Sequence, residues 1–98
     1  MVGDWLDQRT SQGPAALRSR VHDYARVATG TTVADTLAVA AQAALAHVLA
    51  HPGDRSVALD LLAADALITL ALLAQAESAP QDLEQFAESV LLATRSDA

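Results

Sequence analysis

The sequence predicts an all-α fold, an antiparallel bundle of four main helices preceded by a short N-terminal helical segment. Alanine and leucine, two of the strongest helix formers, are the most frequent residues of the 98-residue chain. No segment shows the alternation of apolar and polar residues that is typical of a half-buried strand. The few glycines and prolines separate segments of helical length, and the short loops that they mark favour antiparallel neighbours.

The first segment is expected to be a short helix over residues 4–10, which the sequence SQGP at positions 11–14 interrupts. A main helix follows from about Pro14 to Ala28, because proline suits the first turn of a helix and Gly30 suits its end. Its apolar residues recur at intervals of four, three and four, so they share one face. They are Leu17, Val21, Tyr24 and Ala28.

The second main helix is expected to begin after Thr32 and to end at about His51. Thr32 and Asp35 form a capping-box pattern, in which side-chain oxygens accept hydrogen bonds from the first backbone N–H groups of the helix. The helix ends before Pro52, because the residue before a proline disfavours helical backbone. The side expected to be buried consists of Leu37, Ala41, Ala44, Leu45, Val48 and Leu49.

The third main helix contains the most apolar segment of the chain, VALDLLAADALITLALLAQA at residues 57–76. Asp54 or Ser56 is expected to cap it, and it runs to about Glu77. At 100° per residue its large apolar side chains do not form one stripe but lie on nearly every side. Such a helix needs cover all round. It is therefore expected either to lie at the centre of its own chain or to share a face with a second copy.

The last main helix is expected from about Pro80 to Thr94. The sequence from Ser78 to Gln81 fits a second capping box, with the proline in the first turn. The residues expected on its buried stripe are Leu83, Phe86, Ala87, Val90, Leu91 and Thr94.

The composition narrows the classes of function. The formal net charge is −6, and we expect no nucleic-acid partner because the phosphate backbone requires a concentrated basic surface. The chain has no cysteine, which excludes disulfides, thiolate metal sites and cysteine nucleophiles. No complete catalytic set stands at a recognisable spacing. A non-enzymatic role is therefore the leading expectation, and no cofactor is expected.

We expect one domain over residues 1–98, with residues 1–12 as a candidate for a loosely attached segment. The N-terminal sequence lacks the positive and apolar regions of a signal peptide. Asp60 and Asp65 interrupt the apolar segment and would be costly inside a bilayer, so no membrane span is expected. The protein is expected to be cytoplasmic.

Two histidines suggest a metal site. His47 and His51 are four residues apart and project from one side of the second helix, which is the spacing of two imidazole ligands on a helix. A third ligand is required, and His22 could supply it if the first main helix lies alongside. The alternative is that histidines near a helix C-terminus interact favourably with the helix dipole.

A carboxylate in the apolar helix suggests a ligand site. Asp65 is surrounded by leucine and isoleucine in the helix, with Thr69 one turn further on, and a buried carboxylate requires a partner. We expect a ligand to contact Asp65, Thr69 and Tyr24. Asp60 points about 140° away from Asp65 and suits the positive end of the helix dipole. The alternative for Asp65 is an exposed edge or a structural ion pair.

These observations favour a helical interaction or regulatory module that associates with a second copy, or with another helical protein, through the helix at about 55–77. Its interface would be rich in leucine and alanine. The alternatives are a small-ligand-binding protein with a pocket between helices near Asp65 and, third, a metal-binding protein that uses the histidines. The residues expected at the interface are Leu59, Leu62, Leu70, Leu73 and Trp5.

Overall fold

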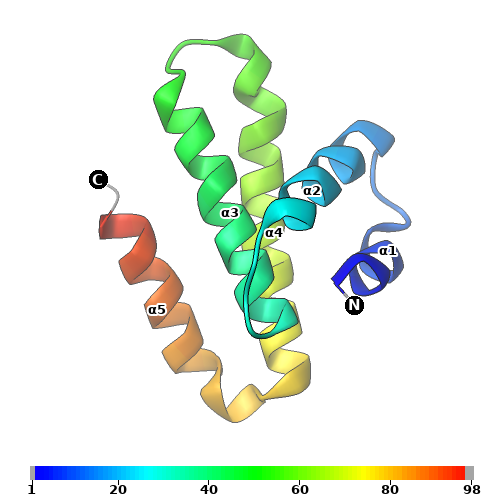
Figure 1. Ribbon diagram of the computed structural model, residues 1–98, viewed down its shortest axis with the longest axis vertical. Coiled ribbons are helices and arrows are strands. Elements are labelled where there is room, and N and C mark those ends of the chain that lie inside the picture. The colour runs from blue at the N-terminus through cyan, green and yellow to red at the C-terminus, as the bar shows by residue number, and fades with distance from the viewer. Residues whose placement is uncertain (1, 97–98) are drawn as a thin grey trace.

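The computed structural model describes residues 2–96 and confirms the all-α fold, since no residue in that range forms a strand (Figure 1). Each predicted helix is present, and short 3-10 turns precede α4 and α5. The elements are α1 (Val2–Thr10), α2 (Ala15–Val27), α3 (Val33–Ala50), η1 (Arg55–Val57), α4 (Ala58–Ser78), η2 (Pro80–Asp82) and α5 (Leu83–Ser96).

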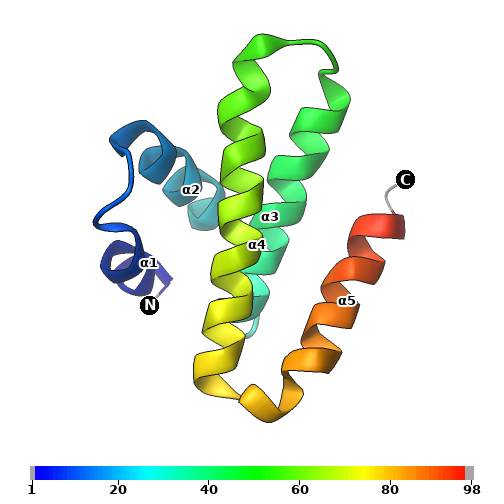
Figure 2. The ribbon, with the colours of Figure 1, turned by 180° about the vertical axis from the view of Figure 1, so that it is seen from behind.

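The centre of the fold is the hairpin of α3 and α4, which run side by side in opposite directions (Figures 1 and 2). Leu37 of α3 and Leu67 of α4 have no exposed surface. Most other buried positions of the two helices are alanines, for example Ala40, Ala44 and Ala63, each with 0% exposure. Small side chains at these positions allow the two helix backbones to approach closely.

The other helices cover only part of this hairpin. Helix α2 lies obliquely across one side of it, α1 packs against α2, and α5 turns back along the hairpin from the end of α4 (Figures 1 and 2). Leu6 anchors α1 and is 1% exposed. The molecule measures 39 × 32 × 19 Å. Since a helix with its side chains is about 10–12 Å wide, the thin dimension holds two layers of helix.

The cap predicted at Thr32 is confirmed, and the one predicted at Asp54 forms at the 3-10 turn before α4, while α4 itself begins without a side-chain cap. The Thr32 hydroxyl accepts a hydrogen bond from the Asp35 backbone N–H at 3.0 Å. The Asp54 carboxylate accepts one from the Ser56 backbone N–H at 2.9 Å, where η1 begins. The cap predicted at Ser78 is wrong. Helix α4 continues through that residue, and the next turn begins at Ala79 without a side-chain cap.

Two residues expected to be buried are exposed. Leu49 is 61% exposed because it lies in the last turns of α3, at the end of the hairpin that neither α2 nor α5 reaches (Figure 1). Leu91 is 57% exposed although Val90 before it is 9% exposed, because Leu91 lies at the edge of the apolar stripe of α5. The rest of the α5 stripe is buried or half-buried.

Two stretches, Val33–Ala50 and Arg55–Ser78, are long and apolar enough to cross a membrane by length and composition. They are the two arms of the central hairpin. The core helices of a soluble protein meet the same criterion, so this finding carries little weight for or against a membrane location.

Candidate functional site

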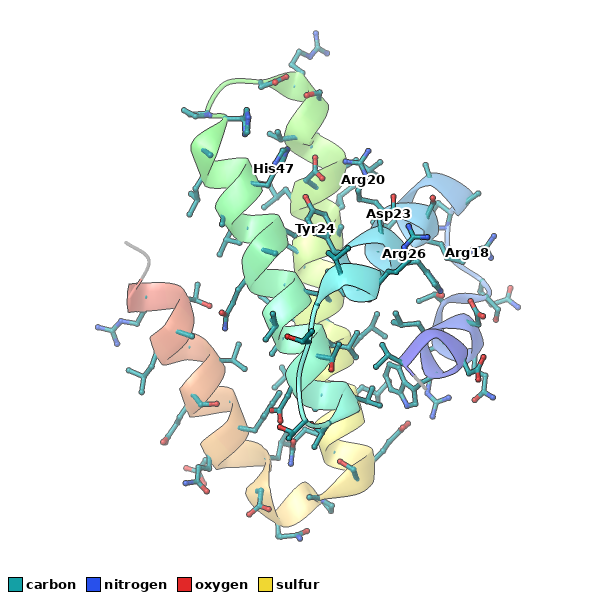
Figure 3. The ribbon with its side chains drawn as sticks, viewed as in Figure 1. Arg18, Arg20, Asp23, Tyr24, Arg26 and His47 are labelled. Atoms are coloured by element: carbon teal, nitrogen blue, oxygen red, sulfur yellow. The ribbon has the colours of Figure 1, made fainter. Side chains whose placement is uncertain are left out.

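The most unusual group in the structure is the carboxylate of Asp60, which is 2% exposed. It lies in the first turn of α4, as the sequence predicts, but on the side that faces the other helices. From α2, the Tyr24 hydroxyl donates a hydrogen bond to Oδ1 of Asp60 at 2.7 Å. Arg20 Nη1 donates to the same oxygen at 2.6 Å. Figure 3 shows Arg20 and Tyr24 where α2 meets the hairpin.

A histidine of α3 completes this cluster. His47 Nε2 lies 3.9 Å from Oδ2 of Asp60, at the edge of ion-pair distance, and its side chain is 46% exposed (Figure 3). The ring of His51 lies beside that of His47, with 4.5 Å between centroids. His51 Nδ1 is also 2.8 Å from the His47 carbonyl oxygen. The Asp60 cluster, meaning Arg20, Tyr24, His47 and Asp60, therefore joins three helices.

The protonation states in the Asp60 cluster follow from burial and hydrogen bonding. Burial alone would raise the pKa of Asp60, but hydrogen bonds from Tyr24 and Arg20, with the charge of Arg20, outweigh it and hold the pKa below its usual value. Burial, followed by the hydrogen bond to Asp60, raises the pKa of Tyr24 to about 12. The hydrogen bond to Asp60 and its negative charge raise the pKa of Arg20.

This arrangement holds α2 against the hairpin. An ionised carboxylate with a lowered pKa is a poor proton acceptor at neutral pH, and a tyrosine with a raised pKa is a poor proton donor to solvent. The Asp60 cluster is therefore built to keep its charges paired in place. Its chemistry is that of a structural ion pair.

Of the predicted ligand residues, Asp65 and Thr69 lie together, but Tyr24 does not join them. Asp65 and Thr69 both lie on the exposed side of α4, and the Thr69 hydroxyl donates to the backbone carbonyl of Asp65 at 3.1 Å. Tyr24 is committed to Asp60. The sequence singled out Asp65 because leucines surround it along the helix, whereas the buried carboxylate is Asp60.

His22 is apart from the other two histidines. His22 lies between α1 and α2, where Nε2 is 2.9 Å from Asp7 Oδ1 and Nδ1 is 2.8 Å from the Arg18 carbonyl oxygen. Within residues 2–96 no group of three or more His, Cys, Asp or Glu side chains is placed to hold a metal ion. The pair His47 and His51 is thus left without a third ligand in that part of the chain.

Trp5 folds back on its own chain. Its Nε1 donates to Glu77 Oε1 at 3.1 Å, and the guanidinium of Arg9 lies 5.0 Å from the centre of its ring. Arg9 also forms an ion pair with Glu77 at 2.8 Å. Trp5, which the sequence predicts at an interface, therefore attaches α1 to the C-terminal end of α4.

The predicted interface leucines divide into two groups. Leu62 and Leu73 are 56% and 40% exposed, whereas Leu59 and Leu70 are half-buried. Leu61, which sequence reasoning did not select, is 52% exposed beside Leu62. The sequence of the apolar segment does not indicate that the side of α4 with Leu61 faces solvent.

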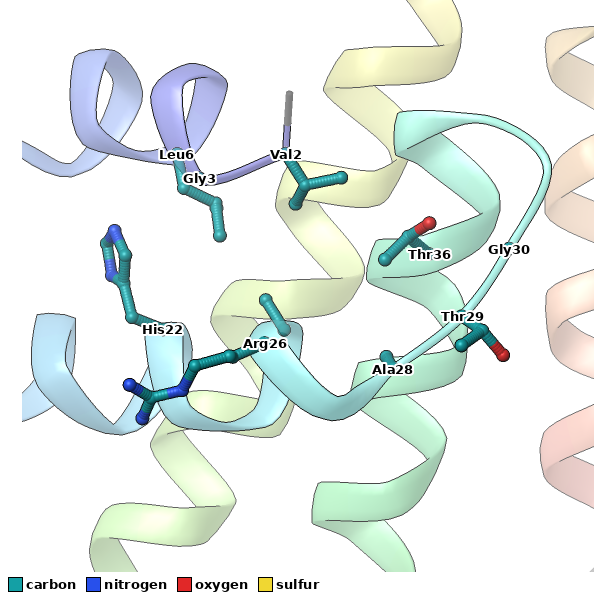
Figure 4. A pocket seen from close by; sticks show the side chains of 10 residues that line it. Val2, Gly3, Leu6, His22, Arg26, Ala28, Thr29, Gly30 and Thr36 are labelled. Atoms are coloured by element: carbon teal, nitrogen blue, oxygen red, sulfur yellow. The ribbon is translucent and has the colours of Figure 1, made fainter.

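Two pockets lie between the helices of the described residues. The larger, about 550 Å³, lies between α1, the end of α2 and the start of α3, with His22 and Arg26 on one side (Figure 4). The smaller, about 300 Å³, lies between α1, α2 and α4, and its lining includes Thr69 and Leu70. Neither is lined by Asp65 itself.

Comparison with known proteins found no relative of this chain. No family model, no curated protein and no solved structure matches the chain.

Proposed function

We propose that this protein is a non-enzymatic interaction module that associates with a second copy of itself through the outer face of α4. The observation that carries the proposal is the exposure of three leucines on that helix. Leu61, Leu62 and Leu73 are 52%, 56% and 40% exposed. In Figure 2 the described helices leave the near side of α4 uncovered.

The thinness of the molecule supports this proposal. A fold two helices thick covers α4 from one side, so its other side meets water or a partner. Large apolar side chains gathered on one exposed helix face are characteristic of interaction sites, because each loses favourable burial energy as long as it stays in water. A second copy of the chain offers an identical apolar face, as in isologous dimers.

Sedimentation equilibrium at micromolar concentration tests the proposal. The chain mass is 10.2 kDa, and we expect the wild-type protein to sediment at twice that mass. Leu62→Glu should sediment as a monomer with an unchanged helical circular dichroism spectrum, because it places a charge on the apolar face. Leu92→Glu is the matched control, since Leu92 is 62% exposed but lies on α5, and it should remain dimeric. A monomeric wild-type protein would refute the proposal.

A second candidate function is the binding of a small amphipathic anion, which the 300 Å³ pocket favours. Its volume is at the lower end of the usual range for ligand sites. Leu17 and Leu70 supply apolar lining, and Arg9 and Arg18 supply positive charge. The anionic dye anilinonaphthalene sulfonate should gain fluorescence with the wild-type protein and less with Arg18→Met. Equal fluorescence with both proteins would count against this candidate.

We also propose that the module works in the cytoplasm, in water and without nucleic acid. Its net charge of −6 repels phosphate backbones, and the exposed carboxylate of Asp65 on α4 would be costly inside a bilayer. Recovery of the untagged protein in the soluble fraction of lysed cells, without detergent, is the expected result. Recovery with the membranes would contradict it.

A further inference from the structure

We infer that the two copies pair through antiparallel α4 helices, with the two-fold axis passing opposite Leu67, so that each Asp65 accepts a hydrogen bond from Thr69 of the other copy. This inference rests on the proposed self-association. It adds the direction of the helices, the register and the polar contact that fixes them.

On the uncovered face of α4, the residues before Leu67 nearly match those at the same distance after it. Counted outward from Leu67, leucine occurs five and six residues away on either side, as Leu62 with Leu72 and as Leu61 with Leu73. Alanine occurs nine residues away on either side, at positions 58 and 76. All these residues are exposed or half-buried. The large apolar side chains therefore form two equal groups, one toward each end of the face.

Helix geometry explains why symmetry about Leu67 matters. Positions equally far before and after one residue lie symmetrically about the line through that residue and the helix axis. Leu67 is 0% exposed and points into the core, so the centre of the symmetric set lies diametrically opposite, on the outer face. A two-fold axis perpendicular to both helices at the level of Leu67 pairs Leu62 with Leu73 and Leu61 with Leu72 of the antiparallel copy, and it sets Asp65 and Thr69 level with each other at the centre. Leucine then meets leucine at both ends of the contact.

Among the mirror pairs on this outer face (58/76, 61/73, 62/72 and 65/69), the one pair of different residues is also complementary. Asp65 and Thr69 lie two residues on either side of Leu67, and both are exposed. In the antiparallel register the carboxylate of Asp65 faces a hydroxyl of the other copy. A covered carboxylate without a donor is costly, and a parallel pair would set Asp65 against Asp65. The Thr69 hydroxyl now donates to the Asp65 backbone carbonyl, and rotation about one side-chain bond redirects it.

A polar pair of this kind selects one arrangement among several that apolar contacts alone would tolerate. Leucines slide past one another at little cost, whereas a shift of register would leave both carboxylates unpaired. Single polar residues within apolar helix interfaces are known to fix register in this way. Asp65 and Thr69 at the centre of the face thus fix the register, while the leucines supply the apolar contact.

Cysteine cross-linking tests the register, and the chain offers a clean background because it has no cysteine. Leu62→Cys and Leu73→Cys are prepared separately, mixed and oxidised. The antiparallel register places position 62 beside position 73 of the other copy, so the mixture should give far more disulfide-linked dimer than either variant alone. Each variant alone should give little, because its two cysteines would be at least about 15 Å apart along the helices, beyond the roughly 7 Å reach of a disulfide between Cα atoms.

Sedimentation of the wild-type protein separates the two ways of failing. A monomer overturns the self-association itself. A dimer in which each cysteine variant cross-links alone, and the mixture gains nothing, overturns the register and leaves the self-association standing.

Exchanging the carboxylate and the hydroxyl between positions 65 and 69 tests the polar contact. Thr69→Asp should weaken the dimer at least tenfold, because it sets two carboxylates against each other. The double variant Asp65→Thr with Thr69→Asp restores a hydroxyl opposite each carboxylate and should recover wild-type affinity. A double variant as weak as Thr69→Asp would refute the contact.

Discussion

Replacing Tyr24 with phenylalanine should destabilise the protein by about 2 kcal/mol. The change removes the hydroxyl that donates to Asp60 at 2.7 Å and keeps the ring, so it leaves no large cavity. A hydrogen bond to a charged group contributes roughly 1.5–3 kcal/mol, and a buried acceptor that loses its donor is not fully compensated by water. Because Asp60 is 2% exposed and keeps the bond from Arg20, the middle of that range is expected.

Urea unfolding followed by far-ultraviolet circular dichroism measures this loss, with all proteins at one concentration. For a chain of this size the midpoint should fall by about 1 M urea. Ser89→Ala is the matched control. It also removes a hydroxyl at hydrogen-bond distance, 2.7 Å from the Phe86 carbonyl oxygen, but on an exposed surface, and should change the stability by less than about 0.5 kcal/mol.

Acid should reveal the same contact. The pKa of Asp60 is lowered in the folded protein, so its pairing contributes stability that is present above the ordinary carboxyl pKa of about 4 and is lost as the pH falls through the folded value. Tyr24→Phe should lose less stability between neutral and acid pH than the wild type. If both proteins have the same midpoint and the same acid dependence, the Tyr24 hydroxyl does not hold the carboxylate and our account of the Asp60 cluster is wrong.

Two further results should follow from the structure. Tyr24 is the sole tyrosine, so tyrosinate absorbance reports its ionisation alone. The transition should occur near pH 12 in the folded protein and near pH 10 in urea. The stability that the neutral hydroxyl provides is therefore full below pH 10 and is lost as the pH rises through the folded pKa. Equal transitions would show that the ring is not buried against Asp60. Gly30→Ala should lower the melting temperature, because a Cβ at that position would lie 2.6 Å from the Thr36 backbone nitrogen, whereas Gly3→Ala, with nothing within 4 Å, should not. Equal melting temperatures would contradict the close approach.

The fold could be predicted from the sequence because the information for it is local. Glycine and proline set the breaks, Thr32 and Asp54 set two helix starts, and apolar periodicity identified the buried sides of α2 and most of α3. The errors at Leu49 and Leu91 have different causes. Periodicity identifies an apolar side of a helix, but it reveals neither how far a neighbouring helix extends along that side, as at Leu49, nor how wide the covered stripe is, as at Leu91.

The candidate site was harder to predict because its partners are distant in sequence. Arg20 and Tyr24 are 40 and 36 positions from Asp60, and they meet it because α2 crosses the hairpin obliquely. Nothing in the apolar segment indicates that its first carboxylate faces inward and Asp65 outward. An acidic residue in the first turn of a helix is usually exposed and explained by the helix dipole, so the pattern around Asp60 resembled an ordinary one.

The distribution of side-chain sizes on α4 gives the strongest reason to connect its sequence with a partner. On its buried side stand alanines, with Ala63 and Ala71 at 0% and 1% exposure, while leucines such as Leu62 and Leu73 stand outside. A fully buried leucine contributes about 1.5–3 kcal/mol from the removal of its apolar surface from water, much more than an alanine does. A helix that packs only within its own chain would gain more stability with leucines on its buried side and alanines on its exposed side. The small inner residues are explained by the close contact with α3, but that contact places no demand on the outer face, where any polar residue would serve a monomer. Leucines kept in two groups about the centre of that face are accounted for if a second α4 covers them.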